Sequence, residues 1–119
     1  MDNQENFEAP QEIVLIPQPN NVVCITFNSS IEKQEDGSYK VESQSGYIHC
    51  TGIPSYDELV TALVRMHYSL DAELALQANL RYDAKGHANE EKAFQDWRVK
   101  CKNAAKNFLN DEKNNQDHI

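Results

Sequence analysis

Hydrophobic and polar positions change their period near the middle of the chain. Before Gly52, the apolar residues Val23, Ile25 and Phe27 repeat at every second position, as expected of a half-buried β-strand. After Pro54, apolar residues recur at the spacing of a helical face. The change of period predicts an α+β fold. In this fold a short antiparallel β-meander is followed by three helices, and the last two form a helical hairpin.

Turn-forming residues divide the first half of the chain into strands. The pairs Asp36-Gly37 and Ser45-Gly46 tolerate the positive φ angles of tight hairpins. They predict a three-stranded meander over residues 22–51. The β region as a whole is expected to span residues 13–52.

A short apolar run precedes the meander and supplies four candidate interaction residues, Ile13, Val14, Leu15 and Ile16. Prolines on both sides limit the run to an edge strand, because proline has no N–H to donate to a β-ladder. Two interpretations are open. The run folds back beside the strand 23–27 of its own chain, or it pairs as an arm with the sheet of a neighbouring subunit.

Capping signals place three helices within residues 55–109. Ser55 followed by Glu58 forms a capping box, and Ser69 is a second N-cap candidate. Residues 83–87 are expected to form a loop between the second helix and the third.

The third helix, predicted from about Asn89 to Leu109, carries two further sets of candidate interaction residues. One is an apolar seam that steps by three and four residues and includes Phe94 and Trp97. This seam packs on the first two helices or is shared between subunits. The other is a basic stripe at every fourth residue, which includes Arg98 and Lys102. It is a solvated face or a contact for the acidic amino-terminal half of a neighbouring copy.

The same patterns set the domain boundaries. Residues 13–109 are expected to form a single domain, with its helical region at residues 55–109. Residues 1–12 lack periodicity and hold few apolar side chains, which predicts a flexible acidic tail. The amide-rich and charged residues 110–119 predict a frayed end.

Charge and hydropathy narrow the range of partners. The chain has 119 residues and a formal net charge of −8, from 11 Lys and Arg against 19 Asp and Glu. Because this charge repels phosphate backbones and anionic lipids, we expect neither nucleic acid nor a membrane as a partner. The apolar run at residues 13–16 is far shorter than the roughly 20 residues of a membrane span. The acidic, amide-rich start does not predict secretion by a signal peptide.

The sequence has no pattern typical of a catalytic, cofactor or metal site. Cys24, Cys50 and Cys101 are an odd number at wide spacing, which fits neither a disulfide framework nor a zinc site. His49 is adjacent to Cys50 on a predicted strand, so their side chains project to opposite faces. The glycines are isolated and do not form a phosphate loop. We therefore expect no enzyme activity, no cofactor and no metal.

A pattern spans residues 68–105: Tyr68-Ser69-x-Asp71-x-Glu73-x-Ala75-Leu76-x-x-Asn79 and, after a variable loop, Phe94-Gln95-x-Trp97-Arg98-x-x-Cys101-Lys102-x-x-Ala105. In this pattern the chain resembles small virion-associated accessory proteins of tailed phages and prophages, whose genes often lie among those for tail or other virion parts. In that family, this segment is a helical hairpin that follows a short β region.

The resemblance implies a non-catalytic structural or accessory protein that acts through protein–protein contacts in the virion, in the tail region. Its partners would be other phage structural proteins or further copies of itself in a homo-oligomer. Its location would be the virion or the host cytoplasm. Two alternatives stay open: a phage assembly chaperone that is not retained in the particle, and a small host-directed regulatory binding protein.

Overall fold

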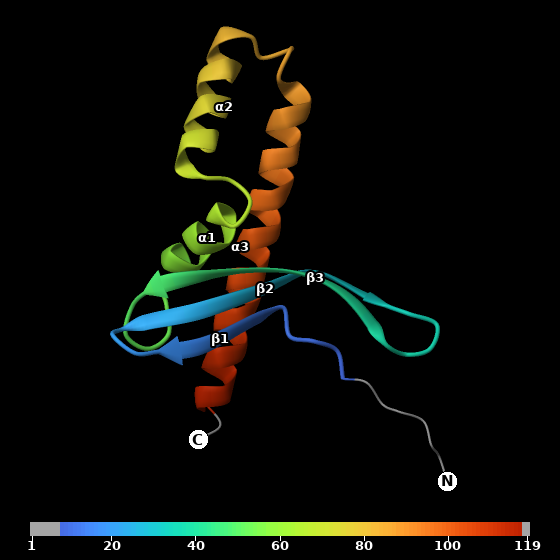
Figure 1. Ribbon diagram of the computed structural model, residues 1–119, viewed down its shortest axis with the longest axis vertical. Helices are drawn as coiled ribbons and strands as arrows, with labels where there is room; N and C mark the ends of the chain where they lie inside the picture. Colours follow the sequence, from blue (N-terminus) through green and yellow to red (C-terminus); the bar gives the residue numbers. More distant parts are fainter. Residues whose placement is uncertain (1–7, 118–119) are drawn as a thin grey trace.

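The computed structural model describes residues 8–117. The predicted α+β class is confirmed, because a three-stranded antiparallel sheet is followed by three helices (Figure 1). The elements are β1 (Ile13–Gln18), β2 (Val22–Lys33), β3 (Tyr39–His49), α1 (Tyr56–Arg65), α2 (Leu70–Tyr82) and α3 (Ala88–Asp117).

The apolar run at residues 13–16 forms β1 and pairs within its own chain. The strand order is β1-β2-β3, and β1 runs antiparallel to β2 with Ile13 opposite Phe27 and Pro17 opposite Val23. The backbone N–H of Asn28 extends the ladder by donating to the carbonyl of Glu12 at 2.8 Å. The structure therefore has the fold-back arrangement, with Pro17 on an edge strand.

The predicted meander over residues 22–51 is wrong in its strand count. This interval holds only β2 and β3, and β1 is the third strand of the sheet. The Asp36-Gly37 turn is confirmed, with Gly37 at a φ of 89°. Ser45-Gly46 is not a turn, because Gly46 lies within β3 opposite Ile25. A Cβ atom at Gly46 would lie 3.6 Å from Cε of Met66, which is an ordinary contact distance, so the end of α1 lies beside this position without requiring a glycine there.

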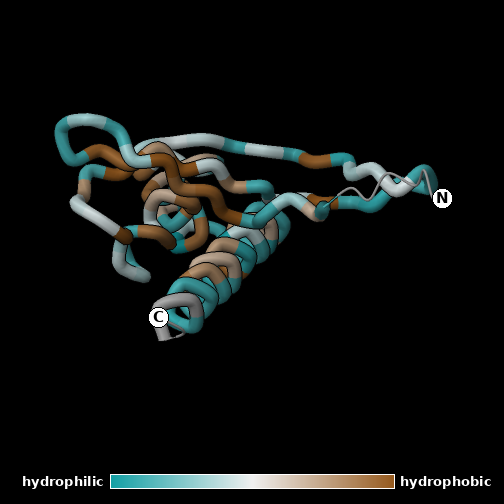
Figure 2. The backbone as a smooth tube through the Cα atoms, turned by 90° about the horizontal axis from the view of Figure 1, so that it is seen from below, coloured by the Kyte–Doolittle hydropathy of each residue, from teal (hydrophilic) through white to brown (hydrophobic). Residues whose placement is uncertain are grey.

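The distal halves of β2 and β3 form a polar hairpin that projects away from the helices (Figure 1). β2 has 12 residues and β3 has 11. A register shift between Asn28 and Ser30 separates the buried half of β2 from the projecting half. Figure 2 shows that hydrophobic residues concentrate where the sheet meets the helices, whereas the hairpin is largely hydrophilic or neutral.

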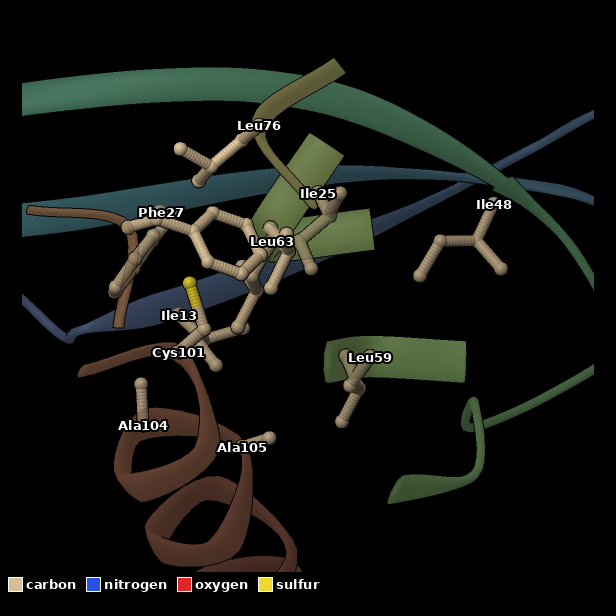
Figure 3. Packing of buried hydrophobic residues seen from close by; sticks show 12 residues of the cluster. Ile13, Ile25, Phe27, Ile48, Leu59, Leu63, Leu76, Cys101, Ala104 and Ala105 are labelled. Carbon is tan, nitrogen blue, oxygen red and sulfur yellow. The ribbon is translucent and has the colours of Figure 1, made fainter. Parts of the chain in front are cut away.

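The core lies between the inner face of the sheet and the helices α1 and α3 (Figure 3). β2 contributes Ile25 and Phe27, both fully buried. α3 meets them with small side chains, which allow a helix to approach closely. The buried residues that surround this pair are Ile13, Ile48, Leu59, Leu63, Val64, Leu76, Phe94, Cys101, Ala104 and Ala105.

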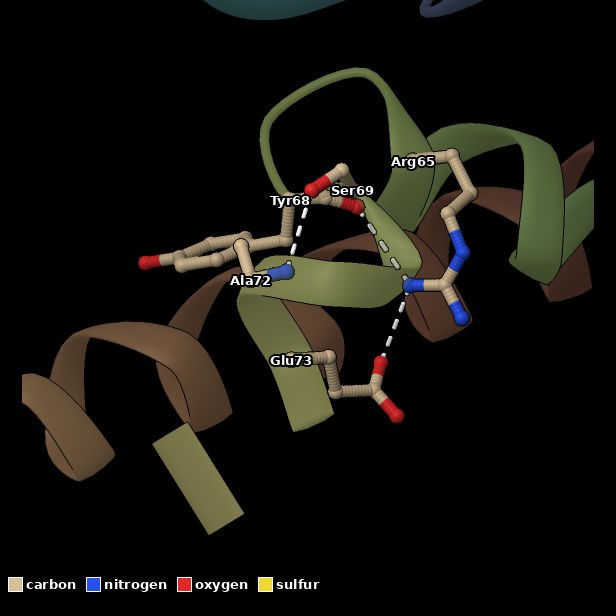
Figure 4. Close-up of polar contacts among 5 residues, drawn as sticks. All are labelled: Arg65, Tyr68, Ser69, Ala72 and Glu73. Carbon is tan, nitrogen blue, oxygen red and sulfur yellow. Dashed lines mark hydrogen bonds and ion pairs between the residues drawn. The ribbon is translucent and has the colours of Figure 1, made fainter. Parts of the chain in front are cut away.

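Both predicted helix caps are present. At α1, the backbone N–H of Ser55 donates to the Glu58 carboxylate at 2.9 Å, and the N–H of Glu58 donates to the Ser55 hydroxyl at 3.2 Å. At α2, the N–H of Ala72 donates to the Ser69 hydroxyl at 3.0 Å (Figure 4). These bonds satisfy N–H groups that have no partner within a helix, and so fix where each helix begins.

The helices α2 and α3 form the expected hairpin, which extends beyond the sheet (Figure 1). Arg65 at the end of α1 ties α2 to α1. Its guanidinium donates to the Glu73 carboxylate at 3.0 Å and to the Tyr68 carbonyl at 3.3 Å (Figure 4). The two helices are thus joined at the corner where the chain turns from the core into the hairpin.

The predicted ends of the domain differ from the observed ones. α3 does not end at Leu109 but continues to Asp117, beside the residues that precede β1. Burial raises the pKa of Glu12, and the nearby Lys100 of α3 partly opposes this shift. Residues 11 and 12 therefore lie against α3, and their carbonyls accept hydrogen bonds from Asn28, so the predicted flexible tail is wrong for these two residues. Residues 1–7 of that predicted tail lie outside the described residues.

Trp97 links the sheet to the helical hairpin. Its ring centroid is 5.5 Å from that of Phe27 and 3.9 Å from that of His67. The indole N–H is buried and has no hydrogen-bond partner among the described residues, and the same holds for the side-chain oxygen of Gln44. Trp97 thus contributes through packing, while its N–H carries an uncompensated desolvation cost.

We predict that Trp97→Ala lowers the free energy of unfolding by about 3 to 5 kcal/mol, because it removes a large side chain that packs on Phe27. Trp97→Phe keeps most of the ring contact and removes the unpaired N–H, so its loss should be clearly smaller. Chemical denaturation followed by circular dichroism measures both. Equal losses for the two variants would show that ring packing is not what Trp97 supplies.

Deletion of residues 1–17 should unfold the domain. It removes nearly all of β1, including the buried Ile13, and leaves β2 paired on one side only, with β3. A thermal melt should then lose its cooperative transition, whereas deletion of residues 1–8, which keeps β1, should retain it. A folded monomer after the longer deletion would instead indicate that β1 is an exchangeable arm.

Candidate protein-interaction surfaces

The outer face of the sheet is open to solvent. Side chains alternate between the two faces of each strand, and the register places Ile16, Cys24 and Tyr47 side by side across the sheet. We call these three residues the outer-face row. Ile16 is 50% exposed and Tyr47 68% exposed, while Cys24 is half-buried between them.

The surroundings of the outer-face row carry no ionised side chain. On either side of it, the register aligns two further uncharged rows, Val14-Thr26-Ser45 and Gln18-Val22-His49. Aspartate, glutamate, lysine and arginine are absent from all three rows, although the chain has a net charge of −8. A partner can therefore cover this face without removing a charge from water, which is a property of the centre of protein interfaces.

The four candidate residues of β1 divide between the two faces. Ile13 is buried in the core, and Leu15 packs against that core. Val14 and Ile16 belong to the outer face by their register with Thr26 and Cys24. Only this second pair is available to a partner.

A groove follows the free edge of β3. It has a volume of about 590 Å³ and lies between residues 45–49 of β3 and the adjacent side of α1. Its apolar wall includes Ala62 and Met66, and Gly46 opens the strand side. Pro17 interrupts the donors on the opposite edge of the sheet, whereas residues 43–49 of β3 contain neither proline nor a charged side chain.

The charged groups of the groove are distributed unequally. Asp57 and Glu58 lie in the first turn of α1, and Arg65 lies in its last turn. The Arg65 charge is already balanced by Glu73 at 3.0 Å. Burial and the nearby Glu58 carboxylate raise the pKa of the Cys50 thiol, which follows β3. The groove thus has an excess of negative charge at its α1 N-terminal end.

The candidate residues of α3 mostly face the protein itself. Phe94 is buried and packs edge-to-face on Tyr68, with ring centroids 4.9 Å apart. With Trp97 on Phe27, this places the apolar seam within the chain. Arg98 and Lys102 line a hollow of about 440 Å³ that acidic side chains of α1 and α2 also line. The two cations therefore lie near acids of their own chain.

Two observations describe the buried thiol and the possible metal ligands in the described part of the chain. Burial raises the pKa of Cys101 to about 12, so its thiol stays protonated and is a poor nucleophile at neutral pH. Within residues 8–117, no three His, Cys, Asp or Glu side chains are grouped as metal ligands would be. In that same part of the chain, no helix is both long and apolar enough to cross a bilayer.

Comparisons of the chain with protein-family profiles, with curated proteins and with solved structures find no match. The interaction surfaces are therefore interpreted from their own geometry.

Sequence reasoning missed the groove because its two walls come from separate elements. Gly46 carries a signal that is ambiguous in sequence, since a glycine marks a turn or a close approach of another backbone. The pairing of Gly46 with Ile25 within β3 excludes the turn. The outer-face row was detectable in part, because the alternation within 22–27 already separates Cys24 from the buried Val23 and Ile25.

We predict that the three thiols react at different rates with a thiol-modifying reagent at neutral pH. Cys24, on the outer face, should react first, Cys50 more slowly because its pKa is raised, and Cys101 only when the protein unfolds. Mass spectrometry of peptides after timed modification measures this order. All three should react alike in denaturant, and rapid native labelling of Cys101 would contradict its burial.

Proposed function

We propose that this chain is a non-catalytic structural or accessory protein of a tailed-phage particle, in the tail region, and that it acts through protein–protein contacts. The observation that carries the proposal is the uncovered outer face of the sheet. Its central row of Ile16, Cys24 and Tyr47 is apolar or aromatic, and none of the described elements covers it. We assign a neighbouring protein of the particle as its occupant.

The physical argument starts from the charge of the molecule. A chain of net charge −8 repels acidic surfaces at long range, yet the outer face offers a partner an area without like charges. An aromatic side chain such as Tyr47 is typical of residues that contribute strongly to interfaces. Exposed apolar area of this kind has no role within the domain itself.

The helical hairpin supports the same proposal. The resemblance to phage accessory proteins implies a hairpin that follows a short β region, and α2 and α3 have that arrangement. Two residues of the resembling pattern, Phe94 and Trp97, pack inside the domain. They therefore support the fold that presents the contact surface rather than the contact itself.

The proposal predicts that the protein is present in purified particles and that Ile16→Lys reduces its incorporation. The lysine would place a charge at the centre of the outer face, which a partner must desolvate. Quantitative mass spectrometry of particles from wild-type and variant genomes measures the effect. Ile31→Lys is the matched control, because Ile31 is also exposed but lies on the projecting hairpin.

Different outcomes separate the alternatives. Absence of the wild-type protein from purified particles would contradict the proposal and favour an assembly chaperone or a host-directed regulator. Normal incorporation of Ile16→Lys would show that the outer face is not the contact surface. Both variants must first show the melting temperature of the wild-type protein.

A further inference from the structure

We propose that the free edge of β3 binds an extended segment of a partner protein as a fourth strand, and that this segment has apolar residues at alternate positions and a basic residue. The site is the groove between β3 and α1. The proposal rests on the proposed function and deepens it by naming the chemistry of a partner. The groove adjoins the outer-face row and shares Tyr47 with it.

The backbone of β3 supplies the first argument. A sheet edge presents N–H and C=O groups that have no partner, and proteins usually protect such edges with proline, lysine or bulges. β1 has Pro17 on its edge, but residues 43–49 of β3 have none of these devices. An added strand would pair there through its own backbone, as in other cases of strand addition.

The position of α1 supplies the second argument. Figure 1 shows α1 beyond the β3 edge of the sheet, and the groove of about 590 Å³ separates the two elements. A fourth strand would therefore lie over α1. Every second side chain of that strand would point toward Ala62 and Met66, which makes alternate apolar residues the complementary pattern.

The charges of the groove and of the whole chain favour a basic residue in the bound segment. Glu58 lines the groove and makes no ion pair among the described residues, and Arg65 is paired with Glu73. Asp57 lines the groove too, although it also borders the hollow of Arg98 and Lys102. A lysine or arginine on the added strand would restore neutrality. The net charge of −8 would also attract a basic segment at long range.

A second copy of this chain is a poorer occupant. If β3 paired with the β3 of another copy, the two α1 helices would both lie beside the same shared edge. Two copies, each with a net charge of −8, would also repel each other at long range. A single extended segment fits the edge without this conflict.

The experiment uses a short synthetic peptide that alternates valine and threonine and carries lysine at both ends. Its affinity for the full-length protein is measured by calorimetry, and hydrogen exchange maps the contact. We expect saturable binding and new protection of β3 amides. Methylation of the peptide backbone nitrogens along one edge should abolish binding, whereas methylation along the other edge should not, because only one edge pairs with β3.

Two variants test the groove and its charge. Thr61→Trp fills the groove from an exposed position and should weaken binding by about tenfold or more. Asp57→Asn should weaken binding of the lysine peptide by about two- to fivefold, as expected for an exposed ion pair. Val99→Trp and Asp71→Asn are the matched controls, since both residues are exposed and neither lines the groove.

Several results would overturn the proposal. These are no binding of the lysine peptide, equal or better binding of a peptide with glutamate at both ends, or binding that survives Thr61→Trp. Loss of binding in Ile16→Lys with full binding in Thr61→Trp would place the peptide on the outer face instead. None of these results bears on whether the protein is present in the particle, so the two proposals can fail separately.

Discussion

The structure depends on covering Ile25 and Phe27, the two fully buried side chains of the central strand. Both belong to β2, which has a neighbour on each side, and their burial requires a second layer close to the sheet. α3 can approach because it presents small residues, among them Ala104 and Ala105, at the contact. Trp97 packs on Phe27 about two turns before this point, so the helix contacts the central strand at two places along its length.

A single layer of helices leaves the rest of the sheet uncovered. The helices pack on the inner face, so nothing among the described residues shields the outer face or the β3 edge. The two edges are not equivalent. Pro17 interrupts the donors on the edge of β1, whereas residues 43–49 of β3 contain no proline. Gly46 lines the groove between this edge and α1.

Signals within a few residues correctly predicted the helix caps and one turn, because these features depend only on neighbouring residues. The Ser55 and Ser69 caps and the Asp36-Gly37 turn each depend on residues within a few positions, and each is present. The errors occur where contacts with a distant segment of the chain determine the local structure. Gly46 was assigned to a turn because its pairing with Ile25 cannot be read from the sequence, and α3 was ended at Leu109 because its packing beside the start of β1 is a long-range contact. The groove depends on such contacts throughout.

The outer face of the sheet and the β3 groove should differ in how strongly salt affects binding. Contacts on the outer face bury uncharged side chains, and their strength should change little with ionic strength. The β3 groove combines unpaired backbone groups with the carboxylates of Asp57 and Glu58, so attraction to a basic strand is screened by salt. A chain with both surfaces can hold one neighbour by its sheet face while a second, extended segment binds or leaves the edge. Both surfaces include Tyr47 of β3, so partners bound at the two would meet at this strand.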